Sequence, residues 1–280
     1  MTKTIIYSDY DEFHEFNDDY LHENFVFTFY LIKMLEKVRK GEIGIYELYN
    51  IIDEHDPSRF IVALKVEENY LINGTNWSSE MMETLIKKVE LTKYKRWIFS
   101  GTHSLITELF VKSDCTFHLF KDRLCYKCEK NNLTFQPSSG ELEMAMMNDI
   151  DELSQISLAY SISEYQQEAR GYDHMRNIVL GGIINNNFFV WRDNGDICAV
   201  AQVIYNDGEP PIIGHLYTVE TKRNKGYAGS ILHGVTQNLL QIGHPGCVLV
   251  SDKNNPASNK VFQKVGYKIM AEHISVSREV

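Results

Sequence analysis

The sequence predicts a mixed α/β (α+β) protein built from two similar halves, and three observations support this prediction. Segments with strand-like and helix-like spacing of apolar residues alternate along the chain, which is typical of sheets flanked by helices. A polar stretch rich in Pro, Gly and Ser at residues 136–140 indicates a domain boundary. The same order of helices, hairpin, helix, short strand, helix and strand occurs on both sides of it, which indicates duplication of one α/β unit.

Composition and charge narrow the class of protein. The 280 residues are 44% apolar and 24% charged, an ordinary globular composition, and the net charge of −10 makes nucleic acid and anionic membranes poor partners. The N-terminus turns acidic at Asp9 before a signal-peptide core can form, and no apolar run approaches the ~18 residues that span a bilayer. Five cysteines, an odd number, indicate no disulfide framework. We therefore expect a cytoplasmic protein.

The first half contains predicted helices, strands and one candidate metal-binding pattern. One predicted helix begins after Asn24 and ends before Gly41, and further helices cover residues 43–52, 80–92 and 103–112. Strands are predicted at 59–66, 70–72 and 97–100. Residues 116–120 and 124–127 are expected to form a hairpin that turns at residues 121–123. Cys115, His118, Cys125 and Cys128 have zinc-like spacing, but residues three apart on a strand point to opposite faces, so we expect no metal site.

The second half repeats this alternation with clearer turn signals. Strands are predicted at 142–146, 188–192, 197–205, 212–219, 247–251 and 267–276, and the turn Asp193–Asp196 contains an Asn-Gly pair typical of hairpins. Helices are predicted at 149–158, 175–185, 227–242 and 257–265. The short strands at 97–100 and 248–251 occupy equivalent places in the two halves.

The stretch His215–Gly229 carries the strongest chemical signal. An apolar strand leads into a basic, Gly-containing turn and then into an amphipathic helix. The unpaired N–H groups of a helix N-terminus, together with nearby Lys and Arg side chains, form a natural site for a pyrophosphate. A capped surface turn with solvated lysines would have the same local pattern, so the turn alone leaves both interpretations open.

A second motif makes the first one more specific. Arg223, Gly226 and Ala228 match the Arg/Gln-x-x-Gly-x-Gly/Ala phosphate loop of the GNAT superfamily of N-acetyltransferases, in the expected strand-to-helix context. About 30 residues later, residues 251–267 resemble the superfamily's next motif, in which an Asn opens a helix that ends in Gly-Phe/Tyr. Residues 141–280 therefore resemble a GNAT domain.

The resemblance is closest to two-domain acetyltransferases with a degenerate GNAT-like N-terminal half. It implies a degenerate domain at 1–136 and an acetyl-CoA-binding catalytic domain at 141–280. Each domain would have a mixed, mostly antiparallel sheet with flanking helices, and the C-terminal one would have a splayed parallel strand pair. Residues 72–79 lack the Arg and spaced glycines of a phosphate loop, so the first half is expected to be a non-catalytic cover or acceptor-binding partner.

The resemblance also assigns cofactor-binding residues. Backbone groups near residues 216–218 would bind the pantetheine arm like an added strand, and the turn from Arg223 would hold the pyrophosphate. The helix that begins after Asn255 would contact the cofactor, although Asn255 before Pro256 is also an ordinary helix cap. The predicted set is Leu216, Tyr217, Thr218, Arg223, Asn224, Lys225, Gly226, Tyr227, Ala228, Gly229, Asn255, Ser258, Asn259 and Phe262.

The catalytic acid and base are less defined by sequence. The superfamily often places a Tyr seven residues after the Asn as the acid that protonates the leaving thiolate, and this chain has Phe262 there. Tyr267 or Tyr227 could replace it. Candidates for the general base are His215 and Glu220, with Asp173 and His174 on the acceptor side.

The predicted function is transfer of an acetyl group from acetyl-CoA to a primary amine, by direct attack of the amine on the thioester. The acceptor would be a small-molecule amine or a protein N-terminal or lysine amine, and the protein would be a monomer or homodimer. The alternative is a non-catalytic acyl-CoA-binding or protein-interaction module that has lost the acid. Among other nucleotide motifs, the Gly-x-x-x-x-Gly-Lys-Ser/Thr loop does not occur in the sequence.

Overall fold

The computed structural model describes residues 1–130, 132, 134–166, 169–205 and 208–279. They form two compact units: Met1–Cys125 with Asp252–Asn254 and Ile269–Val280, and Tyr126–Ser251 with Asn255–Lys268. These units differ from the predicted division at three places. The described residues from Tyr126 to Gln136 belong to the second unit, and Asp252–Asn254 belongs to the first. Nearly all of the last strand also belongs to the first unit, where it pairs with a strand.

The first unit has one sheet with strands in the order β1-β2-β3-β4-β5-β12. Its strand pairs are antiparallel except for β4 and β5, which are parallel. Its elements are β1 (Thr2–Tyr7), α1 (Tyr10–Glu23), α2 (Phe25–Arg39), β2 (Tyr46–Asp53), β3 (Asp56–Val66), β4 (Asn69–Thr75), α3 (Ser79–Val89), β5 (Ile98–Thr102), α4 (His103–Lys112), the start of β6 (Phe117–Cys128) and most of β12 (Lys268–Arg278).

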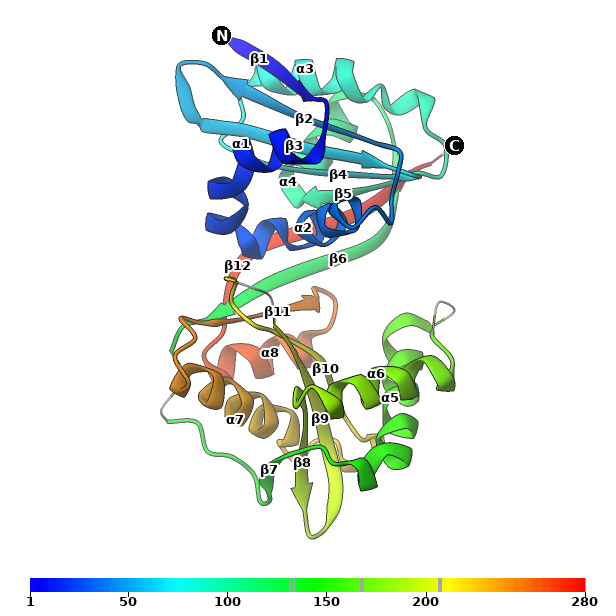
Figure 1. Ribbon diagram of the computed structural model, residues 1–280, viewed down its shortest axis with the longest axis vertical. Helices are drawn as coiled ribbons and strands as arrows, with labels where there is room; N and C mark the ends of the chain where they lie inside the picture. The colour runs from blue at the N-terminus through cyan, green and yellow to red at the C-terminus, as the bar shows by residue number, and fades with distance from the viewer. Residues whose placement is uncertain (131, 133, 167–168, 206–207, 280) are drawn as a thin grey trace. The chain divides into compact units, whose positions relative to one another are not determined.

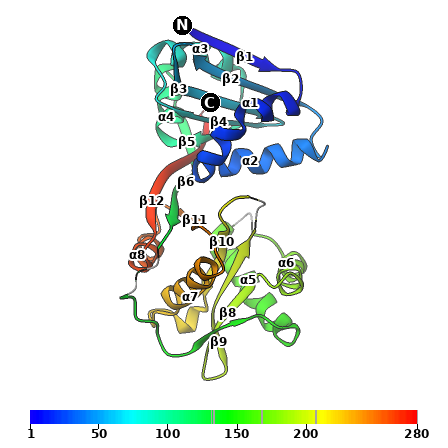
Figure 2. The same ribbon diagram turned by 60° about the vertical axis from the view of Figure 1, so that its left-hand side comes forward.

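Alternation along the strands places helices on both faces of this sheet. Ile61 and Ala63 of β3 pack in one apolar cluster with α3 and α4, whereas Val62 and Leu64 pack in another with α1 and α2. Figure 2 shows α1 and α2 on one side of β2–β4 and α4 on the other. A strand buried on both faces has an almost continuous apolar sequence, which explains the composition of residues 60–64.

The second unit has strands in the order β11-β10-β9-β8-β7. Helices α5 and α6 lie on one side of β8–β10 and α7 lies on the other (Figure 1). Its elements are β7 (Glu141–Met144), α5 (Ile150–Tyr165), α6 (Tyr172–Ile184), β8 (Phe188–Asp193), β9 (Asp196–Ile204), β10 (Ile212–Thr218), α7 (Tyr227–Gln241), β11 (Cys247–Asp252) and α8 (Pro256–Val265).

Two irregularities in β10 open the sheet of the second unit. The parallel pairing of β10 with β11 is limited to Ile212 opposite Val248, so the two strands diverge after this position. On the other edge, the register with β9 shifts so that His215 and Leu216 stand opposite Ala201 alone, which is a β-bulge, and His215 has a φ of 50°. The mixed α/β fold and the splayed strand pair predicted from sequence are confirmed.

The two halves of the chain contain the same order of elements, from β1 to β6 and from β7 to β12. Each half begins with a strand and two helices, continues with three strands and a helix, and ends with strand, helix and strand. The final strand of each half extends into the other compact unit. The chain therefore cannot be divided into the two units by a single cut.

The prediction of a helix at residues 43–52 is wrong, because residues 46–53 form the strand β2. Its apolar residues fit the spacing of a helix as well as that of a strand. Leu48, Tyr49 and Ile51 are all buried, because β2 lies between β1 and β3 with helices over both faces. Pairing with these two neighbours overrides the local helical pattern.

The predicted hairpin at residues 116–127 is also wrong, because residues 117–128 form one continuous strand. The expected turn, residues 121–123, contains no Gly or Asn that would favour a tight reversal. Instead, Asp122 accepts a backbone hydrogen bond from Lys253 at 2.9 Å, and Arg123 Nη1 donates to Ser275 Oγ at 3.2 Å.

Within the described residues, no helix is both long and apolar enough to cross a membrane.

Candidate functional site

A cavity of about 550 Å³ lies in the second unit, where β10 leads into the basic turn and α7. Its size is in the range of small-molecule sites. The end of α5, the start of α8 and the segment before β7 complete its walls. Most of the predicted cofactor-binding residues line it: Leu216, Tyr217, Thr218, Arg223, Asn224, Gly226, Tyr227, Ala228, Gly229, Asn255, Ser258 and Phe262.

The turn before α7 has the geometry of an anion-binding site. Gly226, the residue that precedes the helix, has a φ of 86°, and no side chain caps the helix N-terminus. The first N–H groups of α7 are therefore available to a ligand, and the helix dipole favours a negatively charged ligand. Arg223 reaches from the turn to Tyr217, whose Oη accepts from its guanidinium at 3.3 Å. A positive charge and oriented N–H groups thus face the same cavity.

The strand β10 supplies a second kind of wall. After Ile212 it diverges from β11, so the backbone groups on this edge have no ladder partner from that strand. Thr218 lines the cavity, and its buried Oγ1 has no hydrogen-bond partner in the described part of the chain. Buried polar atoms usually have a partner, so this orphaned hydroxyl indicates a place for a polar group of a ligand.

Asn255, the residue that caps α8, and Phe262 within α8 both line the cavity. The Asn255 side chain accepts from the Ser258 N–H at 3.1 Å, with Pro256 at the first helical position. Asn255 therefore caps its own helix, and it also lines the cavity. Phe262 is only 7% exposed and packs edge-on against Tyr126, at 5.6 Å between ring centroids, yet it reaches the cavity wall.

The three residues predicted to be catalytic, His215, Glu220 and Tyr267, do not line this cavity. His215 is 8% exposed and lies against the rings of Tyr160 and Phe188, with centroids 4.2 and 5.3 Å away. Burial lowers the pKa of His215 to about 4. Since a base of that pKa is a weak proton acceptor near neutral pH, this position favours a packing role.

The other acid and base candidates also have partners that define their roles. Tyr267 is buried, and its hydroxyl shares a 2.7 Å hydrogen bond with Thr236 Oγ1; burial raises the pKa of Tyr267 well above its ordinary value. Glu220 is exposed. Tyr227 does line the cavity, but its hydroxyl donates to Asp193 at 2.6 Å, and this bond raises the pKa of Tyr227 to about 12.

Lys225 and Asn259, two predicted cofactor-binding residues, do not line the cavity. Conversely, sequence reasoning missed Ala257, Val261 and Lys264 of α8, which do line it, and two further groups. Tyr160, Ser163 and Glu164 come from α5, and their i, i+3, i+4 spacing places them on one helix face. Gln136 and Ser138 come from the polar stretch that predicts a domain boundary, and Phe135 directly precedes it. Helical spacing was a usable signal for the first group, whereas nothing local identified the second.

Metal-ligating side chains do not gather in the parts of the chain that the structure describes: no group of three or more His, Cys, Asp or Glu is placed to hold a metal ion. Cys125 and Cys128 are buried thiols, and burial raises the pKa of each. The polar side chains that line the cavity are the cations Arg223 and Lys264, the carboxylate of Glu164, the amides of Gln136, Asn224 and Asn255, and several hydroxyl groups.

Known proteins share this architecture. Residues 192–276 match the family described as FR47-like protein. A GNAT-family acetyltransferase from Colwellia psychrerythraea has a TM-score of 0.64 at 11% identity, covering 99% of this chain and 100% of its own. A GCN5-related N-acetyltransferase from Sphaerobacter thermophilus has a TM-score of 0.56 at 10% identity, covering 88% and 85%. A Drosophila protein has a TM-score of 0.56 at 12% identity, covering 100% and 98%. No protein of curated function is significantly similar in sequence.

These comparisons establish the fold of the chain. The chain has the GNAT acetyltransferase fold over nearly its whole length, and the predicted resemblance to that superfamily is confirmed. Because the structural neighbours share so few residues with it, they establish the fold alone, and function has to be argued from the site.

Proposed function

We propose that this protein transfers an acetyl group from acetyl-CoA to a primary amine, with both substrates bound together. One observation carries the proposal: a single cavity combines the uncapped start of α7, the guanidinium of Arg223 and the free edge of a diverging strand. Pyrophosphate suits the first two, and an amide-containing arm suits the third.

The residues present fit this cosubstrate. The N–H groups at the start of α7 and Arg223 would bind the pyrophosphate, and the free edge of β10 would bind the peptide-like arm. The orphaned hydroxyl of Thr218 would find a partner there. Acetyl-CoA, when bound, would supply the activated acyl group. The bulge interrupts the pairing with β9 at His215 and Leu216. We propose that backbone N–H groups of this strand polarise the carbonyl oxygen of the thioester.

Proton transfer would depend on groups that line the cavity. The carboxylate of Glu164 and the phenols of Tyr160 and Tyr217 can accept or donate protons at its α5 end. The rings of Tyr160 and Tyr217 are 6.2 Å apart, and Arg223 lies over the Tyr217 ring at 5.4 Å. The phosphate end and the α5 end are thus joined through Tyr217.

The α5 end is the proposed site of the acceptor amine. Carboxylate and aromatic faces attract ammonium groups, so Glu164, Tyr160 and Tyr217 favour a cationic amine. Both a small-molecule amine and a protein N-terminal or lysine amine satisfy this chemistry. We propose that the enzyme acts as a monomer or homodimer, without nucleic acid or membrane partners.

Two observations favour a second candidate, a non-catalytic acyl-CoA-binding or protein-interaction module. Phe262 cannot donate a proton at the position where the superfamily often has a Tyr. His215 is buried, and its lowered pKa makes it a poor base. Both leave cofactor binding intact while removing candidate catalytic groups.

The experiment that tests the proposal measures thermal unfolding with CoA or acetyl-CoA and then thioester turnover with a panel of amines. A ligand that binds only the folded protein at about 100 times its Kd adds about 2.7 kcal/mol of stability. We expect such a shift together with turnover. A shift without turnover on any amine would support the non-catalytic acyl-CoA-binding module. No shift at millimolar CoA would overturn both the acetyltransferase and the acyl-CoA-binding module.

A further inference from the structure

Ser138 makes two hydrogen bonds to the turn that precedes α7. Its Oγ donates to the carbonyl oxygen of Lys225 at 2.6 Å. Its backbone N–H donates to Ser230 Oγ at 2.8 Å, and that hydroxyl in turn donates to the Gly226 carbonyl at 3.2 Å. Ser138, which lies three residues before β7, therefore contacts Lys225 directly and is linked to Gly226 through Ser230.

The next residue fixes this segment to the rest of the second unit. The Ser139 carbonyl accepts from Trp191 Nε1 of β8 at 2.9 Å. Ser139 Oγ donates to Asp193 Oδ2 at 2.9 Å, the same oxygen that accepts from the hydroxyl of Tyr227 at 2.6 Å. Ser138 and Ser139 thus connect the turn and the first residue of α7 to the β8–β9 hairpin.

These contacts determine the direction of a backbone donor. In a trans peptide unit the C=O and N–H groups point in opposite directions. The bond from Ser138 to the Lys225 carbonyl therefore also sets the direction of the Gly226 N–H. The fit is close, because a Cβ on Gly226 would lie 2.5 Å from Ser138 Oγ. A glycine with positive φ is flexible, so without this bond the turn would be less ordered.

We propose that Ser138 is a positioning residue for the cofactor, which holds the turn Arg223–Gly229 in its anion-binding conformation before the ligand binds. This inference rests on the proposed function, because it assumes that a pyrophosphate binds at the turn. Preorganisation raises affinity by reducing the ordering that binding requires. Ser138 acts through the backbone of the turn.

The test compares Ser138→Ala with Ser154→Ala, a matched loss of one serine hydroxyl. Ser154 is buried in α5, donates to the Ile150 carbonyl and does not line the cavity. In calorimetric titration we expect Ser138→Ala to raise the Kd for CoA about five- to tenfold, the value of one neutral hydrogen bond. The Kd for pantetheine, which lacks the pyrophosphate, should stay unchanged, and KM for acetyl-CoA should rise more than kcat changes. Ser154→Ala should leave all of these values unchanged.

Amide hydrogen exchange on the ligand-free protein separates this inference from the proposed function. Ser138→Ala should accelerate exchange at Gly226 and Tyr227 without accelerating it along the rest of α7. If wild-type protein binds CoA and Ser138→Ala binds it equally well, the inference is overturned. If wild-type protein does not bind CoA, the proposed function fails and the cofactor-positioning role fails with it. Unchanged exchange in the turn would overturn the inference whatever the outcome of the titration.

Discussion

The two units have the same order of elements but differ where the fourth strand of each half, β4 or β10, approaches its parallel neighbour. In the first unit, β4 and β5 stay paired over four positions, from Asn69 opposite Ile98 to Ile72 opposite Gly101. In the second, β10 and β11 meet at Ile212 and Val248 alone. One sheet is closed and the other is open at the same point of the fold, and the large cavity occurs beside the open one.

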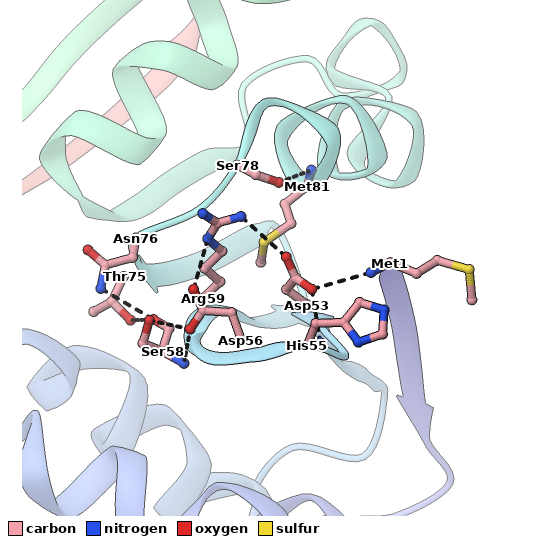
Figure 3. Close-up of polar contacts among 10 residues, drawn as sticks. All are labelled: Met1, Asp53, His55, Asp56, Ser58, Arg59, Thr75, Asn76, Ser78 and Met81. Carbon is pink, nitrogen blue, oxygen red and sulfur yellow. Dashed lines mark hydrogen bonds and ion pairs between the residues drawn. The ribbon is translucent and has the colours of Figure 1, made fainter.

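The helix that follows this strand also differs between the two units, because a side chain caps α3 and none caps α7. In the first unit, Ser78 caps α3 by accepting from the Met81 N–H at 3.2 Å, and Thr75 and Asn76 donate to the Ser58 carbonyl (Figure 3). In the second, α7 has no side-chain cap and its turn carries Arg223. The shared fold therefore leaves helix N–H donors available for the proposed anion site in the second unit, where no side chain caps the helix. This difference supports a non-catalytic first unit, which stays a prediction.

The largest expected effect comes from closing the open turn. Gly226→Val places a β-branched side chain at a φ of 86° and against Ser138 Oγ, so we expect about 100-fold weaker CoA binding, or about 2.8 kcal/mol. Gly243→Val is the control, because Gly243 has a φ of 100°, nothing lies within 4 Å of an added Cβ, and it is not part of the cavity wall. Calorimetric titration measures both. Equal CoA affinity in the two variants would show that the turn is not the binding site.

The second prediction concerns pH and one buried histidine in each unit. Burial lowers the pKa of His215 to about 4 and that of His273 to about 3. Because the unfolded chain binds a proton near pH 6.5, the stability that each neutral histidine contributes is present above that pH and lost as pH falls toward the folded pKa. For His215 the full loss is about 3 kcal/mol.

His215→Asn tests this dependence, since Asn tolerates the φ of 50° and does not titrate. Urea unfolding at pH 7.5 and 5 should show a smaller loss of stability in the variant, and His273→Asn is the matched change in the first unit. An unaltered pH dependence in both would contradict the burial argument. A 100-fold loss of turnover in His215→Asn would instead restore His215 as the general base.

The smallest expected effect is in the capped turn of the first unit. Ser78→Ala removes the N-cap of α3, so the free energy of unfolding should fall by about 1 kcal/mol. Since Ser78 and the residues of its turn do not line the cavity, the affinity for CoA should not change. Urea unfolding and CoA titration measure the two quantities. A change in CoA affinity beyond twofold would mean that the first unit contributes to the binding site.

The sequence by itself determined the features that depend on neighbouring residues. Arg223, Gly226 and Ala228 are recognisable because a strand, a turn and a helix N-terminus form within fifteen residues, and their chemistry follows from that local geometry. The alternation of strands and helices likewise predicted the fold class. Local patterns failed for β2 and β6, where pairing with distant strands decided the structure.

Only the tertiary structure decided which side chains surround the cavity. Ser138 contacts Lys225 across 87 residues of sequence, and Tyr160 meets Tyr217 from a different element. The imidazole of His215 is a common general base, but this side chain is buried like a core residue. Its burial depends on Tyr160 and Phe188, which pack against it. Spacing along the chain fixes backbone geometry over a few residues, whereas burial, pKa and cavity walls depend on contacts that form only when distant segments pack together.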